Sequence, residues 1–112
     1  MTVDVVCSMN NKWTMDGYIV EGTHTGHDAS SIPSVYVSKF TVGNASSTPI
    51  TTVLLDANKT YTLFLTSSDF TTNVNTYYNG TEVAHYYNSS DPYNTVFNTN
   101  NPIDKISISI WD

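Results

Sequence analysis

The residues best suited to binding chemistry surround one turn signal, Asn79-Gly80. This dipeptide favours a two-residue β-hairpin turn because both of its residues accept positive φ. It lies between two runs of alternating side chains, 73–78 and 81–87, which predict the two strands of a hairpin. The cross-strand partners that we expect, moving away from the turn, are Tyr78 and Thr81, Tyr77 and Glu82, Thr76 and Val83, Asn75 and Ala84, and Val74 and His85.

This register gives the predicted hairpin a core face and an outer face. The core face carries the valines and comprises Val74, Thr76, Tyr78, Val83, His85 and Tyr87. On that face His85 would be a hydrogen-bonded core histidine and not a ligand. The outer face comprises Asn73, Asn75, Tyr77, Glu82, Ala84 and Tyr86, and so presents two tyrosines beside a carboxylate and amides.

Tyrosine, amide and carboxylate side chains together suit the recognition of sugars. The C–H faces of a sugar stack on aromatic rings, while its hydroxyls require paired donors and acceptors. The candidate ligand-binding residues are Asn75, Tyr77, Glu82, Tyr86, Asn88, Asp91 and Tyr93. Two other interpretations stay open: tyrosine also suits an ordinary strand surface, and the same face could contact another protein.

One short segment has metal-ligand character, His24-Thr25-Gly26-His27-Asp28. Two histidines three positions apart could share a divalent ion with Asp28, but no cysteine pair or third histidine is near them in the sequence. No run of spaced carboxylates resembles a calcium loop. We therefore predict no metal and no other cofactor, with His24, His27 and Asp28 left as an open alternative.

The sequence carries no recognisable catalytic motif. Any of the ten acidic residues could meet in the fold as a glycosidase pair. However, no nucleophile elbow, phosphate-binding glycine loop or dinucleotide fingerprint is present, and a small sandwich rarely encloses a deep pocket. We expect a protein that is not an enzyme.

Composition limits the partners and the class of protein. There is no arginine, the only fixed cations are four lysines, and the formal net charge is −6, which argues against nucleic acid and anionic membranes as partners. No segment has the length of apolar residues that a membrane span requires, and the start lacks the features of a classical signal peptide. We expect a cytoplasmic protein or one exported without a leader, and leave the compartment open.

Ser, Thr, Asn and Tyr dominate the 112 residues and favour strands and turns over helices. We expect a single domain, residues 1–112, folded as an all-β, antiparallel, immunoglobulin-like β-sandwich of about seven or eight strands. Besides the hairpin, the expected strands are Thr2–Met9, Trp13–Val20 with a turn or bulge at Asp16-Gly17, Val35–Val42, Val53–Leu55, Tyr61–Leu65 and Lys105–Trp111. Asn88–Pro102 reads as a polar loop, and Cys7 as a buried, inert thiol.

The stretch Thr51–Thr66 forms the centre of the predicted fold, as a strand, a corner and a strand. Leu55 and Tyr61 stand six positions apart, so the tyrosine hydroxyl can reach back to a backbone group of the turn. In the second strand Tyr61, Leu63 and Leu65 alternate with threonines. We expect the first set to face a core and the other face, with Phe64 its one apolar residue, to meet mostly water.

Three stretches resemble the fungal immunomodulatory proteins, which are small lectin-like immunoglobulin-type sandwiches. They are Val53-Leu54-Leu55-Asp56 through Lys59-Thr60-Tyr61-Thr62, Tyr86-Tyr87-Asn88 with the tyrosine-containing loop that follows, and a last strand that ends in Trp111. The corner also resembles that of fibronectin type III domains. The resemblance implies homodimerisation, binding to cell-surface glycans and agglutination of cells, as in a hemagglutinin.

The sequence thus predicts a noncatalytic carbohydrate-binding protein, a lectin that self-associates and binds cell-surface glycans or glycoproteins. The alternative is an immunoglobulin-like domain with a structural or protein-interaction role. A binder that depends on a metal at His24, His27 and Asp28 is the third possibility.

Overall fold

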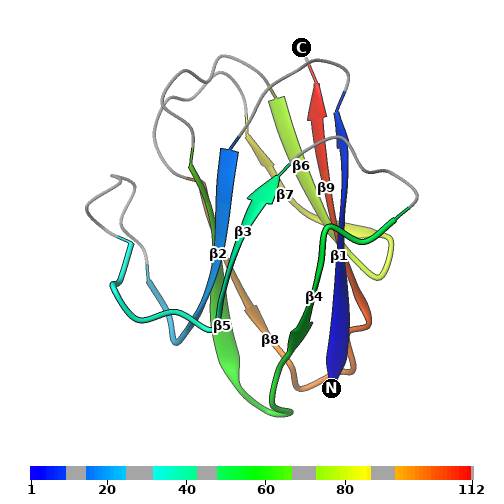
Figure 1. Ribbon diagram of the computed structural model, residues 1–112. Helices are drawn as coiled ribbons and strands as arrows, with labels where there is room; N and C mark the ends of the chain where they lie inside the picture. The colour runs from blue at the N-terminus through cyan, green and yellow to red at the C-terminus, as the bar shows by residue number, and fades with distance from the viewer. Residues whose placement is uncertain (10–14, 25–31, 43–47, 67–72, 87–92, 112) are drawn as a thin grey trace.

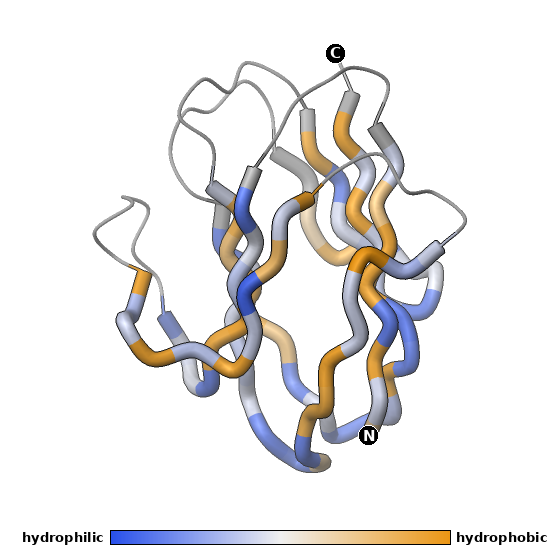
Figure 2. Tube along the Cα trace, viewed as in Figure 1, coloured by the Kyte–Doolittle hydropathy of each residue, from blue (hydrophilic) through white to orange (hydrophobic). Residues whose placement is uncertain are grey.

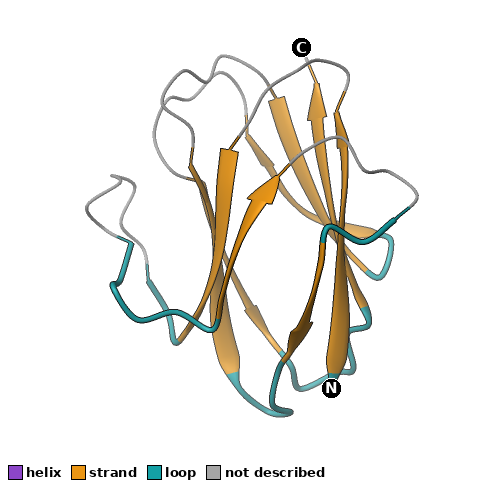
Figure 3. Cartoon of the chain, viewed as in Figure 1, coloured by secondary structure: helices purple, strands orange, loops and turns teal. Residues whose placement is uncertain are grey.

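In the computed structural model, the described part of the chain forms nine β-strands in two sheets that pack face to face as a β-sandwich (Figures 1 and 3). The structure describes residues 1–9, 15–24, 32–42, 48–66, 73–86 and 93–111. It describes the backbone alone for Met9, Met15, Asn73, His85, Tyr86, Tyr93 and Trp111. Among the described residues no helix has the length and hydrophobicity to cross a membrane.

The first sheet consists, in spatial order, of β4 (Thr51–Leu54), β1 (Thr2–Met9), β9 (Lys105–Trp111), β6 (Asn73–Tyr78) and β7 (Thr81–Tyr86). The second consists of β3 (Ser38–Val42), β2 (Met15–Glu21), β5 (Thr60–Thr66) and β8 (Tyr93–Asn98). Neighbouring strands are antiparallel except β1 and β9, which run parallel. The expected antiparallel β-sandwich is confirmed, and the parallel pairing of β1 with β9 is an exception that the sequence did not predict.

Strand positions agree with the sequence in most places and differ in three. β1 and β9 have the predicted bounds. The predicted polar loop Asn88–Pro102 contains β8, and β3 begins at Ser38, three residues after Val35. Asp16 and Gly17 form no turn or bulge, because both pair in register with β3 on one side and β5 on the other.

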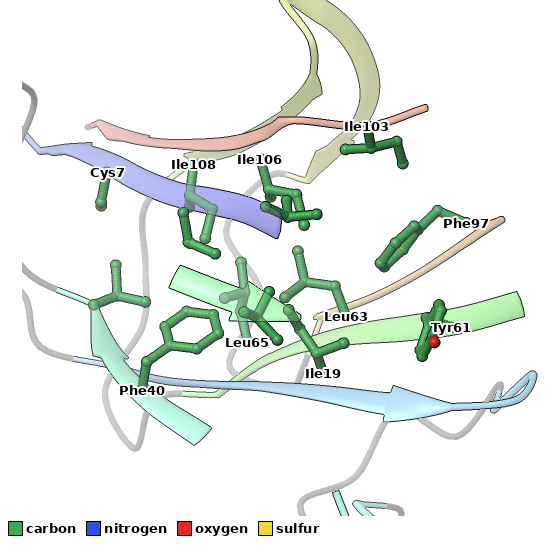
Figure 4. Packing of buried hydrophobic residues seen from close by; sticks show 14 of the residues in the cluster. Cys7, Ile19, Phe40, Tyr61, Leu63, Leu65, Phe97, Ile103, Ile106 and Ile108 are labelled. Atoms are coloured by element: carbon green, nitrogen blue, oxygen red, sulfur yellow. The ribbon is translucent and has the colours of Figure 1, made fainter. Parts of the chain in front are cut away.

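The core lies between the sheets and is built by alternation along the strands (Figures 2 and 4). Ile106 and Ile108 of β9 point toward Leu63 and Leu65 of β5 (Figure 4). Each such burial stabilises the fold by about 1.5–3 kcal/mol. Cys7 belongs to this core, and its burial raises the pKa of the thiol to about 12, as expected of an inert cysteine.

The corner between β4 and β5 carries the chain from the first sheet to the second. The Asp56 amide donates to Tyr61 Oη at 3.0 Å, which confirms the predicted tyrosine corner. Thr99 reinforces it: its hydroxyl donates to the Asp56 carbonyl at 2.6 Å and accepts from the Lys59 amide at 3.0 Å. Lys59 also donates to Glu21 at 3.0 Å, and this bond raises the pKa of the lysine.

Replacing Tyr61 with Phe removes the corner hydroxyl and keeps the buried ring. We expect Tyr61→Phe to lower the free energy of unfolding by about 0.5–1.5 kcal/mol, the net value of one such hydrogen bond. Urea unfolding followed by tryptophan fluorescence measures this loss. Tyr18→Phe on the outer face of β2 is the matched control, and an equal loss in both variants would contradict a role for the corner bond.

The outer face of the second sheet is partly covered, contrary to expectation. Thr62 and Phe64 are fully buried although they alternate with the core residues of β5. The segment after β2 lies over them: Thr62 Oγ1 donates to the Gly22 carbonyl at 2.7 Å and accepts from the His24 amide at 3.1 Å, and the His24 and Phe64 ring centroids are 6.2 Å apart. This face of β5 therefore forms a small second apolar layer instead of meeting water.

Candidate functional site

The candidate site lies on the outer face of the first sheet, where β9, β6 and β7 lie side by side (Figure 1). Ser107 of β9 is the register partner of Tyr77 of β6, and Tyr77 is the partner of Glu82 of β7. Side chains at paired positions share a face of the sheet. Ser107, Tyr77 and Glu82 therefore form a row across three strands, and with Asn75 they are called here the tyrosine face.

Asn75 holds the carboxylate of this row in place. Its side-chain amide donates to Glu82 Oε1. Asn75 is only 7% exposed although it alternates with the core residues Val74 and Thr76 of β6, whereas Glu82 is exposed. A surface carboxylate with a fixed orientation presents its acceptors in defined directions, which favours recognition of hydroxyl or amide groups.

The hairpin follows the predicted register only next to its turn. Asn79 and Gly80 have φ values of 51° and 84°, as a type I′ turn requires, and Tyr78 pairs with Thr81. A β-bulge then shifts the pairing, so that Ala84 lies opposite Thr76, and the predicted partners beyond Glu82 are wrong by one position.

The bulge changes the faces of β7. Val83, predicted in the core, is 44% exposed, because the extra residue at the bulge leaves it beside Glu82 on the outer side. His85 lies opposite Asn75 in the register and not opposite Val74 as expected. The register that predicted His85 on the core face is therefore wrong.

The structure brings together only part of the predicted ligand-binding set. Asn75, Tyr77 and Glu82 share the tyrosine face. Tyr86 was expected on the outer face beside Tyr77, but its backbone pairs with the core residue Val74, so the observed register does not support that position. Tyr93 pairs with Leu65 in the other sheet. Asn88 and Asp91 lie outside the described residues.

A polar depression adjoins the row beside the β6–β7 turn. Its volume is about 550 Å³, and it is lined by Asn79, Gly80, Asp104, Lys105 and Ser107. None of these residues was in the predicted set. The alternation in Lys105–Trp111 already predicts that Lys105 and Ser107 lie on the face away from the core isoleucines. The pairing of β9 with β6, however, joins residues far apart in the chain, so no local sequence pattern indicates it.

The histidine segment lies on the opposite side of the sandwich. His24 Nε2 donates to the Glu21 carbonyl at 3.0 Å, and His24 helps line an apolar depression of about 280 Å³ with Pro33, Val35 and Tyr36. The described residues contain no cluster of histidine, cysteine and acidic side chains that could hold a metal ion. His27 and Asp28 lie outside the described residues.

Comparison with known proteins adds no further constraint on the site. No family model, curated protein or solved structure matches the chain. The chemistry of the tyrosine face and its neighbouring depression is therefore the main support for a binding function. Its components are one half-buried aromatic ring, one oriented carboxylate and a set of hydroxyl, amide and ammonium groups.

Proposed function

We propose that this chain is a noncatalytic carbohydrate-binding protein, a lectin whose tyrosine face contacts glycans on cell surfaces or glycoproteins. The observation that carries the proposal is the row Ser107, Tyr77 and Glu82, with Glu82 oriented by Asn75. A sugar stacked on the Tyr77 ring would place its hydroxyls beside an acceptor on one side and a serine hydroxyl on the other. Such pairing of apolar and polar contacts is what sugar recognition requires.

Self-association is part of this proposal. A single shallow face without a deep pocket binds weakly, and two or more linked faces raise the overall avidity by about 10²–10⁴ without new contacts. The resemblance of the corner and last strand to fungal immunomodulatory proteins supports a homodimer that agglutinates cells. The outer face of the first sheet would then be repeated in each copy of the assembly.

Truncating the central ring tests the proposal. We expect Tyr77→Ala to weaken binding to an immobilised glycoprotein by about tenfold or more, as for an aromatic anchor at the centre of an interface. Surface plasmon resonance measures the change. Tyr36→Ala is the matched control, because Tyr36 is 44% exposed on the opposite side of the sandwich, and equal losses in the two variants would contradict a site on the tyrosine face.

A protein-interaction role is the second candidate function, and one surface favours it. Val35 is 80% exposed, and its neighbours Tyr36 and Val37 are each 44% exposed; these three residues are called here the valine segment. Apolar residues gathered on a surface often mark a protein contact. Competition separates the two functions: free sugars should displace a glycoprotein bound at the tyrosine face, and should leave a protein bound at the valine segment in place.

A further inference from the structure

The depression beside the β6–β7 turn is continuous with the tyrosine face. Ser107 belongs to both, since it lines the depression and pairs with Tyr77. Asn79 follows Tyr77 by two residues, a distance of about 7 Å along an extended chain. The surface from Asn75 to Asn79 is therefore about 13 Å long, which exceeds the width of one sugar ring.

One residue fixes the two walls of the depression relative to each other. The Asn79 amide donates to the Lys105 carbonyl at 3.0 Å, and its Nδ2 donates to the Pro102 carbonyl at 3.0 Å. Its Oδ1 accepts from the amides of Asp104 and Lys105 at 3.0 and 3.3 Å. Four hydrogen bonds thus join the turn to residues 102–105, at and just before the start of β9, so the depression is formed before any ligand arrives.

The lining groups suit hydroxyls more than rings or ions. The carboxylate of Asp104 accepts, the ammonium of Lys105 donates, and the hydroxyl of Ser107 does both. Gly80 has no side chain, and an added Cβ would meet no atom within 4 Å, so the rim is open toward solvent at the turn. The depression can orient the hydroxyls of a second ring while Tyr77 stacks on the first.

Charge decides which sugars fit. The outer side of this sheet carries Asp4 and Glu82 besides Asp104, and Asp4 is the register neighbour of Lys105 on β1. Among the described residues, this side of the sheet with its adjoining turn carries three carboxylates and one ammonium, on a chain whose formal net charge is −6. Like charges repel an anionic ligand, so uronic or sulfated sugars are disfavoured.

We propose, resting on the proposed function, that this depression is a second subsite of the tyrosine face and that the face takes a neutral oligosaccharide longer than one ring. Tyr77 is the stacking platform, and Asp104 and Ser107 hold the hydroxyls of the adjoining ring. The ammonium of Lys105 donates to the same ring.

A chain-length series tests this inference. The probes are glucose, mannose, galactose and N-acetylglucosamine oligomers from monosaccharide to tetrasaccharide, with galacturonic acid oligomers as the anionic series, and calorimetry gives the affinity. In at least one neutral series we expect affinity to rise about tenfold from the monosaccharide to the trisaccharide. Asp104→Ala combined with Lys105→Ala should remove that rise and leave the monosaccharide affinity within about twofold, because neither residue belongs to the tyrosine face.

The control is Thr41→Val, an exposed strand position in the opposite sheet, which should keep the full rise. If affinity does not depend on oligosaccharide length, or if the double variant shows the same length dependence as the native protein, the second subsite is overturned while the proposed function stands. Tighter binding of galacturonic acid than of galactose oligomers overturns the neutral preference. Absence of binding in every series overturns both the subsite and the carbohydrate-binding function.

Discussion

Phe64→Ala should be among the most damaging single substitutions in this protein, with a loss of about 3–5 kcal/mol in the free energy of unfolding. Phe64 points away from the core between the sheets, yet none of its surface is exposed. It is covered on the outer side, where His24 packs against it and Thr62 bonds to the same segment. Truncation would leave a cavity beneath this cover and would also loosen the segment.

Val96→Ala is the matched control, since Val96 lies on the outer face of the neighbouring strand β8 and is 42% exposed. Val96→Ala should change the free energy of unfolding by no more than about 0.5 kcal/mol, as is usual for surface positions. Urea unfolding of both variants, with circular dichroism as the readout, measures the difference. Small and similar losses would mean that the segment does not bury this face of β5 in solution.

Gly17→Ala should lower the free energy of unfolding by about 1–3 kcal/mol, which is usual when a side chain is enlarged in a filled core. Gly17 of β2 is the register partner of Phe40 of β3, and the phenylalanine ring occupies the space above the glycine. A Cβ at position 17 would collide with Cε2 and Cζ of that ring. Phe40 is only 7% exposed, so its ring has little room to move aside.

A double-mutant cycle isolates this steric effect. Phe40→Leu shortens the side chain above residue 17, so Gly17→Ala should cost less in that background than in the native protein. We expect a coupling energy of about 0.5–3 kcal/mol from thermal or urea unfolding of the four proteins. Additive losses would show that the glycine is required for another reason, such as backbone conformation.

Local signals predicted the parts of the fold that depend on neighbours in sequence. Asn79-Gly80 identified its turn because few other residue pairs accept positive φ twice. The alternation of Ile106, Ile108 and Ile110 gave β9 and its buried face. The spacing of Leu55 and Tyr61 indicated the corner hydrogen bond, since the geometry of that corner is local.

The differences arise where distant parts of the chain meet. Strand β8 was missed because its asparagines and threonine read as loop residues, although Phe97 is buried against Tyr61 and Tyr78. Gly17 read as a turn, whereas it accommodates the ring of Phe40. The cover over Phe64 and the parallel pairing of β1 with β9 follow from contacts between strands far apart in sequence, which residue periodicity does not report.

The candidate site was predictable in its centre and not at its borders. Tyr77 and Glu82 pair across the turn as expected, because the register next to a two-residue turn is fixed by the turn itself. The bulge beyond Glu82 altered the expected neighbours, as the sequence between 82 and 84 contains no glycine to signal it. The contribution of Ser107 and of the turn depression required the neighbouring strand β9.

A glycan array probed with the purified native protein and with Tyr77→Ala tests whether the tyrosine face binds carbohydrate. We expect the native protein to bind selectively, with binding that free sugar competes away and that a chelator does not change. Tyr77→Ala should lose this binding while its circular dichroism spectrum stays native. Silence of the folded native protein across the array, or undiminished binding by Tyr77→Ala, would contradict a carbohydrate site on the tyrosine face.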